Sequence, residues 1–208
     1  MYYYFEKGDV VKDLNKILIS SENKLLSEYL EVSLLDSIKI NQAIFWLLDE
    51  SEKNNFRIYK THLLKFFSIL ELIFAQEYRN SFTKQQYVAL ENGPIPGKLK
   101  ELIEEVQLNQ LTNIEFIDSL AFKARKLEKG TEVIKNEEFV QSLEFLSEKD
   151  LEAMNKALKL ILELKTVEKL SEFTHKSKSY YHYYGLAKKE GKNSYPMDFS
   201  IDLSKARE

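Results

Sequence analysis

The chain of 208 residues has no cysteine, only 6 glycines and 3 prolines, and a single tryptophan. Without cysteine it has no disulfides, thiolate metal sites or cysteine nucleophiles, and this fits a reducing cytosol. A long hydrophobic run is also missing. The longest, Phe66 to Ala75, contains Glu71 and is far shorter than the roughly 20 apolar residues that span a bilayer. The N-terminus lacks the basic start and apolar stretch of a signal peptide. We therefore expect a soluble, cytoplasmic protein without membrane contact.

Aromatic and charged side chains are abundant. The chain holds 12 tyrosines and 13 phenylalanines, and 30% of its residues are charged, with a formal net charge of -3. Many aromatics and few helix breakers favour long helices with aromatic packing between them. The length suits one domain better than two independent cores. The small negative charge argues against a protein built as a whole to bind nucleic acid, although a local basic face is compatible with it.

The segment from about Tyr59 to Arg79 predicts the central helix of the fold. Its apolar residues run nearly all the way round a helix, which is typical of a helix buried on most sides. A second helix is predicted from Asp36 or Ser37 to about Lys53, followed by a turn. The apolar residues of the central segment are Leu63, Leu64, Phe66, Phe67, Ile69, Leu70, Leu72, Ile73 and Phe74.

Residues 81–97 carry mixed signals. Thr83-Lys84-Gln85-Gln86 matches a capping box and favours a helix start, but the residues that follow do not settle the period. Asn92 to Gly97 predicts a turn, because two prolines and two glycines do not fit a helix or a central strand. A helix to about Gln107 is predicted after it.

Residues 111–140 lose the helical period and predict a small β element. A hairpin turn is expected at Lys129-Gly130. Ser147 then opens a capping box and a helix to about Leu164. Two further helices are predicted, over Val167–Phe173 and Ser179–Lys189. The residues compatible with short strands are Ile114, Phe116, Phe122, Ala124 and Leu127.

These elements predict a mainly α fold: a single helical domain around a central buried helix, with a small β-hairpin element. An α+β fold is the alternative. We divide the chain into an N-terminal helical extension (1–35), the domain itself (36–190) and an extended C-terminal tail (191–208). Within the extension, helical spacing is shown by Val10, Val11, Leu14, Ile17 and Leu18.

Three stretches carry a family resemblance. They are YKTHLLKFF at 59–67, FTKQQYVALENGPIP at 82–96 and LSEFTH at 170–175. In this order and at these spacings they resemble the Panacea domain, typified by the SocA-like antitoxins, over roughly residues 36–185. Two positions depart from the pattern. Lys84 stands where the family usually has glycine, and the tryptophan often found a few residues after the histidine is replaced by Tyr180 or Tyr181. These departures bear on local geometry more than on the fold.

The resemblance implies a partner-binding role. Members of the family neutralise varied toxins by binding them directly, at least one is thought to act as an adaptor for proteolysis, and others occur in phage-related contexts. It therefore implies a cognate toxin protein as partner, encoded next to this chain.

Candidate partner-binding residues lie in the second and third stretches. Gly93, Pro94, Ile95 and Pro96 form either a rigid structural turn or a loop that presents Ile95 to a partner. Thr174 and His175 lie at a predicted helix end, where a histidine can interact with the last carbonyls and the helix dipole.

Residues 176–192 combine five lysines and a single acid with four tyrosines. Three interpretations are open. Tyr180 and its neighbours pack into the core, or Tyr180 and Tyr181 anchor a protein interface, or the lysines meet nucleic acid. The candidate nucleic-acid contacts are Lys178, Lys188 and Lys189.

Motifs of enzyme chemistry are missing from the sequence, including a phosphate-binding glycine loop, a nucleophile elbow and a zinc-binding helix. We expect no catalytic residues, no metal site and no cofactor. The predicted function is an antitoxin-like protein-binding module that neutralises a toxin by direct binding or by delivering it for proteolysis. A nucleic-acid-binding regulator and a structural protein of a phage or mobile element are the alternatives. Assembly into a homo-oligomer is compatible with each.

Overall fold

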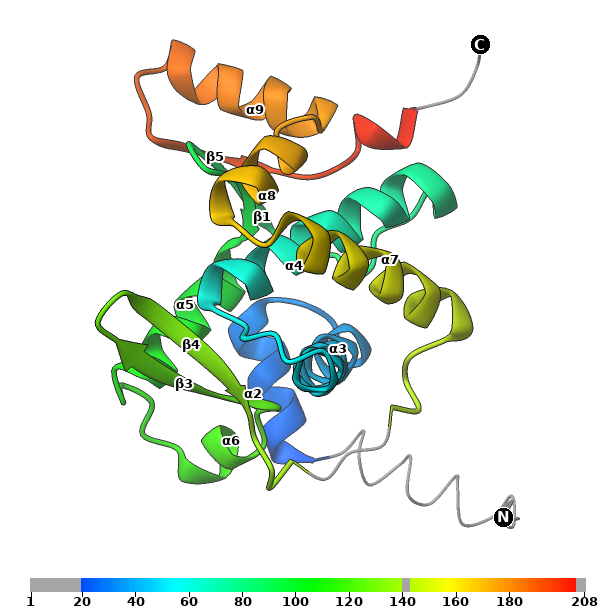
Figure 1. The fold of residues 1–208 in the computed structure, drawn as a ribbon. Coiled ribbons are helices and arrows are strands. Elements are labelled where there is room, and N and C mark those ends of the chain that lie inside the picture. The colour runs from blue at the N-terminus through cyan, green and yellow to red at the C-terminus, as the bar shows by residue number, and fades with distance from the viewer. Residues whose placement is uncertain (1–19, 140–142, 205–208) are drawn as a thin grey trace.

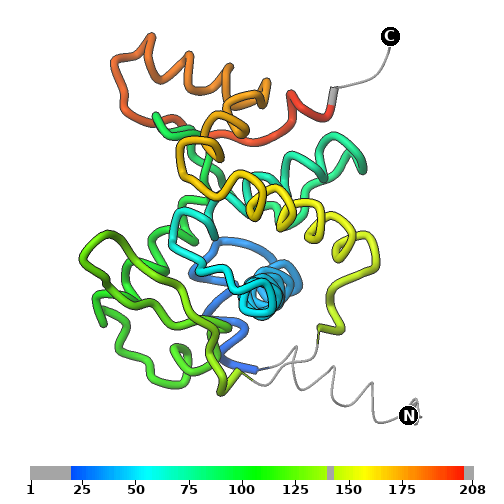
Figure 2. The backbone as a smooth tube through the Cα atoms, in the orientation of Figure 1, coloured from blue at the N-terminus to red at the C-terminus, as the bar shows by residue number. Residues whose placement is uncertain are grey.

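Helix α4 (Lys60–Ile73) lies at the centre of the molecule (Figure 1). The structure is a computed structural model that describes residues 20–139 and 143–204. It is mainly helical with a small antiparallel β component, as the sequence predicts. In Figure 2 the chain forms a lower body and an upper layer, and the upper layer is made by the orange C-terminal segment lying over the green strand beneath it.

The prediction of a central buried helix is confirmed. Leu63, Phe66 and Ile69 are fully buried, and α4 contacts helices and strands on several sides. Its last turn continues as a π-helical segment, η1 (Phe74–Tyr78), and ends at Arg79 in the left-handed conformation. His62 at its start is structural: the ring receives the Tyr59 amide hydrogen bond at 3.3 Å and lies 3.0 Å from the Lys165 carbonyl oxygen.

Helix α3 (Leu34–Lys53) begins before the predicted Asp36 or Ser37. Ser33 is the actual cap, because its hydroxyl accepts a hydrogen bond from the Asp36 amide at 3.2 Å. Helix α2 (Ser21–Leu30) precedes it and packs against α3. The helical spacing predicted over 10–18 lies outside the described residues. No helix in the described part of the chain is long and apolar enough to span a membrane.

The helix start that the capping box at Thr83 favours is not formed, and the period that the sequence left open is that of a strand. Both donor groups of Thr83 are bound by the buried carboxylate of Glu71, at 3.0 Å from the amide and 2.9 Å from the hydroxyl. The Phe82 amide donates to the same carboxylate at 2.9 Å. Because the threonine is used by α4, it does not cap a helix, and the chain enters strand β1 (Tyr87–Leu90).

The prediction that Asn92 to Gly97 is wholly a turn is also wrong. Gly93–Pro96 is strand β2, paired antiparallel with β1 so that Leu90 faces Gly93 and Tyr87 faces Pro96. The two prolines are tolerated because β2 is an edge strand in the order β2-β1-β5, where a missing N–H need not break the ladder. The turn itself is limited to Glu91 and Asn92.

The segment expected as a tail, 191–208, contributes the third strand of this sheet. Strand β5 (Ser194–Met197) pairs antiparallel with β1. A short 3-10 turn, η2 (Asp202–Ser204), follows, and Asp202 accepts hydrogen bonds from the Ser177 hydroxyl at 2.6 Å and the Ser179 amide at 3.1 Å. The C-terminal segment thus fixes both β1 and the start of the last helix.

Residues 111–140 contain the predicted hairpin, formed by β3 (Phe122–Leu127) and β4 (Gly130–Lys135). The expected strand around Ile114 and Phe116 is instead the short helix α6 (Ile114–Asp118), capped by the Asn113 side chain. Helix α5 (Gly97–Gln107) precedes it as predicted.

The C-terminal helices agree closely with the predictions. Helix α7 (Glu148–Leu164) has the capping box expected at Ser147 and lies against α4. It is followed by α8 (Val167–Thr174) and α9 (Lys178–Lys189).

Lys84 adopts φ +53°, a left-handed conformation that favours glycine. The position is one at which the resembled family usually has glycine, so the backbone accounts for that preference.

We expect Lys84→Gly to stabilise the protein by about 1 kcal/mol in urea unfolding, because it relieves the left-handed strain. Lys129→Gly is the matched control, since Lys129 is exposed in the β3–β4 turn and lies outside the left-handed region. An equal effect of the two substitutions would exclude this explanation.

Candidate functional site

The three stretches that carry the resemblance meet at the side chain of Lys65. Lys65 projects from α4, and its ammonium donates hydrogen bonds to the carbonyl of Asn92 in the β1–β2 turn and to the hydroxyl of Thr174 in α8, the latter at 3.0 Å. Thr174 in turn donates to the Ser171 carbonyl at 3.1 Å, which leaves its oxygen free to accept. One lysine therefore joins three segments that are distant in sequence. We call this contact of Lys65 with Asn92 and Thr174 the junction.

Lys65 is almost completely buried, with 1% of its surface exposed. Burial lowers the pKa of its ammonium to about 7. A carboxylate would offset the cost of burying this charge, but no described carboxylate forms an ion pair with Lys65, whose described partners are the neutral Asn92 and Thr174 oxygens. The described part of the chain thus holds a buried amine without a counter-ion.

Gly93 makes the close approach of the β1–β2 turn possible. Its φ is +96°, and a Cβ at this position would lie 2.4 Å from the Lys65 Nζ and 2.7 Å from the Thr174 hydroxyl oxygen. Any larger residue would displace the lysine or the threonine. The glycine is required by both its backbone conformation and the space around it.

A stack of rings runs from this junction to α9. The His175 ring lies parallel to that of Tyr180, with centroids 4.5 Å apart, and Tyr180 stacks on Tyr184 at 5.3 Å. The Tyr180 hydroxyl donates to the Leu90 carbonyl at 2.9 Å, which anchors α9 on the β1–β2 hairpin. Burial and the charge of Lys65 lower the pKa of His175. Burial and Lys65 thus favour a neutral imidazole, and the stack holds α9 in a fixed orientation.

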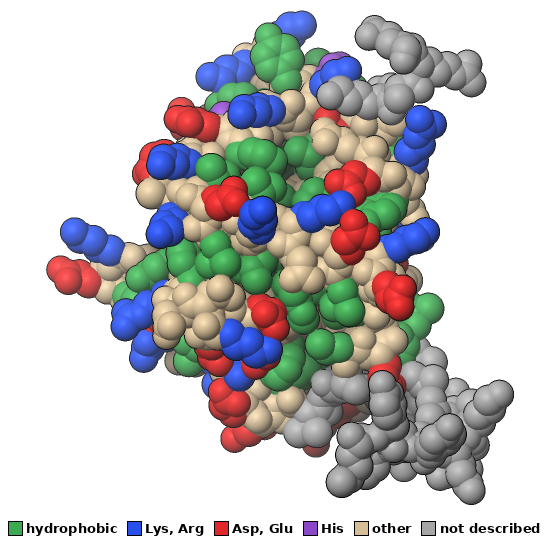
Figure 3. Space-filling model, turned by 45° about the vertical axis from the view of Figure 1, so that its right-hand side comes forward, with side chains coloured by type: hydrophobic (Ala, Val, Ile, Leu, Met, Phe, Trp, Pro, Cys, Tyr) green, Lys and Arg blue, Asp and Glu red, His purple; other side chains and the backbone are tan. Residues whose placement is uncertain are grey.

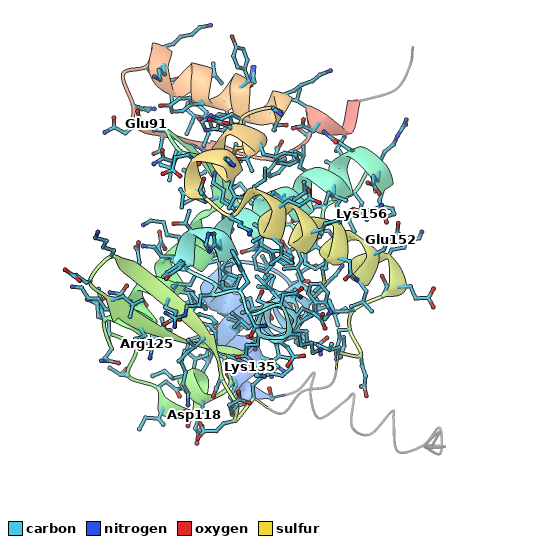
Figure 4. All side chains as sticks on the ribbon, viewed as in Figure 1. Glu91, Asp118, Arg125, Lys135, Glu152 and Lys156 are labelled. Carbon is cyan, nitrogen blue, oxygen red and sulfur yellow. The ribbon has the colours of Figure 1, made fainter. Side chains whose placement is uncertain are left out.

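A cleft of about 370 Å³ opens beside the junction. Its walls are mainly apolar, and Lys65 is the only buried charged residue among those that line it. Glu91, at the hairpin turn, lies on its rim next to the upper layer (Figure 4). The other lining residues are Lys60, Thr61, Leu64, Leu90, Asn92, Gly93, Ile95, Lys100, Val167 and Asn193.

The predicted site residues divide into an inner and an outer group. Pro94, Ile95 and Pro96 are buried, and Ile95 retains only 8% of its exposure, so it belongs to the core in this structure. The junction brings Gly93, Thr174, His175 and Tyr180 together. The outer residues are Tyr181, Lys178, Lys188 and Lys189, all on α9 and exposed.

The exposed face of α9 carries Tyr181, which is 81% exposed and the most exposed of the large hydrophobic side chains in the described structure. Three lysines, Lys178, Lys188 and Lys189, are exposed on the same helix. At the top of Figure 3, blue basic side chains gather around a protruding green one over the α9 layer. We call Tyr181, Lys178, Lys188 and Lys189 the α9 face.

Lys65 and Asp202 are not among the site residues that the sequence predicts. The signal for Lys65 was a lysine inside a segment whose apolar residues run all round the helix, which predicts a buried amine. Asp202 gave no usable signal, because its role depends on a non-local strand.

The junction places the Lys65 ammonium within hydrogen-bonding distance of the Thr174 hydroxyl. Among the described residues, no group of three or more His, Cys, Asp or Glu side chains is arranged to hold a metal ion. The arrangement is suited to holding the β1–β2 hairpin and α8 against α4 and to donating hydrogen bonds.

The family described as "Antitoxin SocA-like, Panacea domain" matches residues 63–180, which include the whole junction. Searches of curated proteins and of solved structures gave no match.

Gly93→Ala tests the crowding at the junction. We expect it to lower the free energy of unfolding by about 1–3 kcal/mol more than Gly130→Ala, measured by urea unfolding. Gly130 is the matched control because its φ is +103° and a Cβ there meets nothing within 4 Å. Similar losses in the two variants would show that backbone strain, and not contact with Lys65, requires the glycine.

Stability should rise with pH through the titration of Lys65. In the unfolded chain a lysine releases its proton near pH ~10.4, but the folded-state pKa is about 7. Between these values the unfolded chain binds more protons, so the free energy of unfolding should increase by up to about 1.4 kcal/mol per pH unit. Lys65→Met should remove this part of the slope and Lys178→Met should retain it. A slope unchanged by Lys65→Met would refute the assignment.

Proposed function

Because the chain belongs to the SocA-like antitoxin family of Panacea domains, we propose that it neutralises a partner toxin by binding it directly, without chemistry of its own. In this proposal the toxin is encoded next to the chain and the two proteins meet in the cytoplasm. The single observation that supports this function most is the α9 face, an exposed aromatic and basic surface on a helix whose opposite side is fixed.

Rigidity makes this face suitable for binding. Tyr180 is buried and hydrogen-bonded to the hairpin, whereas its neighbour Tyr181 is exposed. Asp202 holds the start of the same helix. An aromatic side chain presented by an ordered helix loses little conformational entropy on binding, which is why tyrosines are frequent anchors of interfaces. The surrounding lysines would form the rim and select an acidic partner surface.

Tyr181→Ala should weaken binding to the toxin at least about tenfold and reduce rescue of toxin-expressing cells. The measurement is the growth of cells that co-express this chain with the product of the adjacent gene, together with the affinity of the purified pair. Ile114→Ala is the matched control, because Ile114 is 72% exposed and lies on α6. Loss of rescue in the control, with Tyr181→Ala unaffected, would place the interface elsewhere.

The level of the toxin in rescued cells separates direct neutralisation from delivery to a protease. A constant toxin level with restored growth supports occlusion by binding. A level that falls when this chain is present supports the adaptor role. If the adjacent gene product neither binds this chain nor is neutralised by it, the proposed function is wrong.

A nucleic-acid-binding regulator is the second candidate, and the basic side of α9 favours it. Lys178 and Lys189 are exposed, and the Lys188 Nζ lies 5.0 Å from the centre of the Tyr184 ring. This candidate requires binding to DNA or RNA that falls steeply with added salt and is lost in a Lys188→Glu, Lys189→Glu double variant. Absence of binding at low salt would eliminate it.

A further inference from the structure

We propose that the cleft beside Lys65 is a binding site for an apolar carboxylate, whose charged group meets the Lys65 ammonium while its hydrocarbon part fills the apolar walls. The ligand is either a free carboxylic acid or the C-terminal residue of a polypeptide, since both present the same chemistry. This inference does not depend on the antitoxin function.

The buried charge of Lys65 favours an anionic ligand. Lys65 is 1% exposed and lacks an ion-pair partner among the described residues. An ammonium has three N–H donors, and the Asn92 carbonyl and the Thr174 hydroxyl account for two of them. The third donor has no acceptor among the described residues, and Lys65 is one of the residues that line the cleft. A carboxylate is the acceptor that best offsets a buried positive charge.

The walls of the cleft favour a ligand with a hydrocarbon part. Leu64, Leu90, Ile95 and Val167 line the cleft, and its volume of about 370 Å³ lies in the range of small-molecule sites. A few polar groups at one end of an apolar cavity are typical of sites that orient an amphipathic ligand. A ligand of about the size of one blocked amino acid fits these dimensions better than a free inorganic anion.

The rim of the cleft carries balanced charges. Lys60 and Lys100 line the cleft, and both form ion pairs with the same carboxylate, Glu104, each at 2.8 Å. With Glu91, which also lines the cleft, two acidic groups stand against these two lysines, so Lys65 is the unbalanced charge of the lining. An anion entering the cleft is therefore attracted to Lys65 rather than held at the rim.

The test uses N-acetyl-leucine and N-acetyl-leucine amide as probes on the full chain, followed by NMR at about one pH unit below the pKa of Lys65. The acid should shift the signals of Gly93, Val167 and the Lys65 side chain, and the amide should bind at least about tenfold more weakly. N-acetyl-glycine should also bind more weakly, because it leaves the apolar walls unfilled. Equal binding of acid and amide, or no shift at millimolar concentration, overturns the proposal.

Two variants locate the site. Lys65→Met should reduce the affinity for N-acetyl-leucine at least about tenfold. Val167→Trp should block the cleft without touching the lysine, whereas Ile114→Trp, on exposed α6, should have no effect. Val167→Trp keeps the test decisive if Lys65→Met does not fold. Binding that survives in both cleft variants would show that the acid binds elsewhere and would overturn the proposal.

A tripeptide, N-acetyl-Ala-Ala-Leu, distinguishes the two sources. If the tripeptide acid binds and its amide does not, the cleft accepts a polypeptide C-terminus. If only N-acetyl-leucine binds, the cleft is closed to a chain and takes a free acid. Either result supports the carboxylate site, and loss of rescue by the antitoxin assay is neither required nor expected from it.

Discussion

The structure depends on one buried amine. Lys65 is on the central helix, and its ammonium binds the Asn92 carbonyl and the Thr174 hydroxyl, so α4, the β1–β2 turn and α8 are held at one point. This interaction accounts for other features of the sequence. Gly93 is a glycine because a Cβ there would strike the lysine, and Thr174 accepts from the lysine while donating to its own helix. A buried charge is costly, so a fold that keeps one needs its hydrogen-bond partners in fixed places.

The junction also connects the interior to the proposed binding surface. His175 follows Thr174 directly and stacks on Tyr180, and Tyr180 stacks on Tyr184. These three rings form a continuous stack from the junction to α9. The exposed side of α9 therefore lies on a rigid support. The C-terminal segment contributes from the other side, through β5 on β1 and Asp202 at the start of α9. The family match covers residues 63–180, so β5 and Asp202 lie outside it while supporting the same helix.

Local and periodic signals in the sequence predicted most of the helices. The apolar residues of α4 and the capping box at Ser147 both correspond to the observed elements, because each depends on residues within one turn or one helix. The capping box at Thr83 failed for a physical reason: its hydroxyl binds Glu71, a partner that no local pattern reveals. Pro94 and Pro96 were assigned to a turn. Their strand is an edge strand because β5 pairs with the other side of β1, and local sequence does not reveal that pairing. Gly93, Thr174, His175 and Tyr180 were singled out from the sequence as candidate partner-binding residues, and the structure places them together around Lys65. Lys65 itself was hidden within an apolar stretch and Asp202 in a non-local contact.

The most direct measurement of the central claim is a double-mutant cycle between Lys65→Met and Thr174→Val, with the free energy of unfolding of the four proteins measured in urea. If the lysine and the threonine hold α4 and α8 together, their coupling energy should be at least about 1 kcal/mol. Additive effects, with a coupling energy below about 0.3 kcal/mol, would show that Lys65 does not join these helices and would contradict the account.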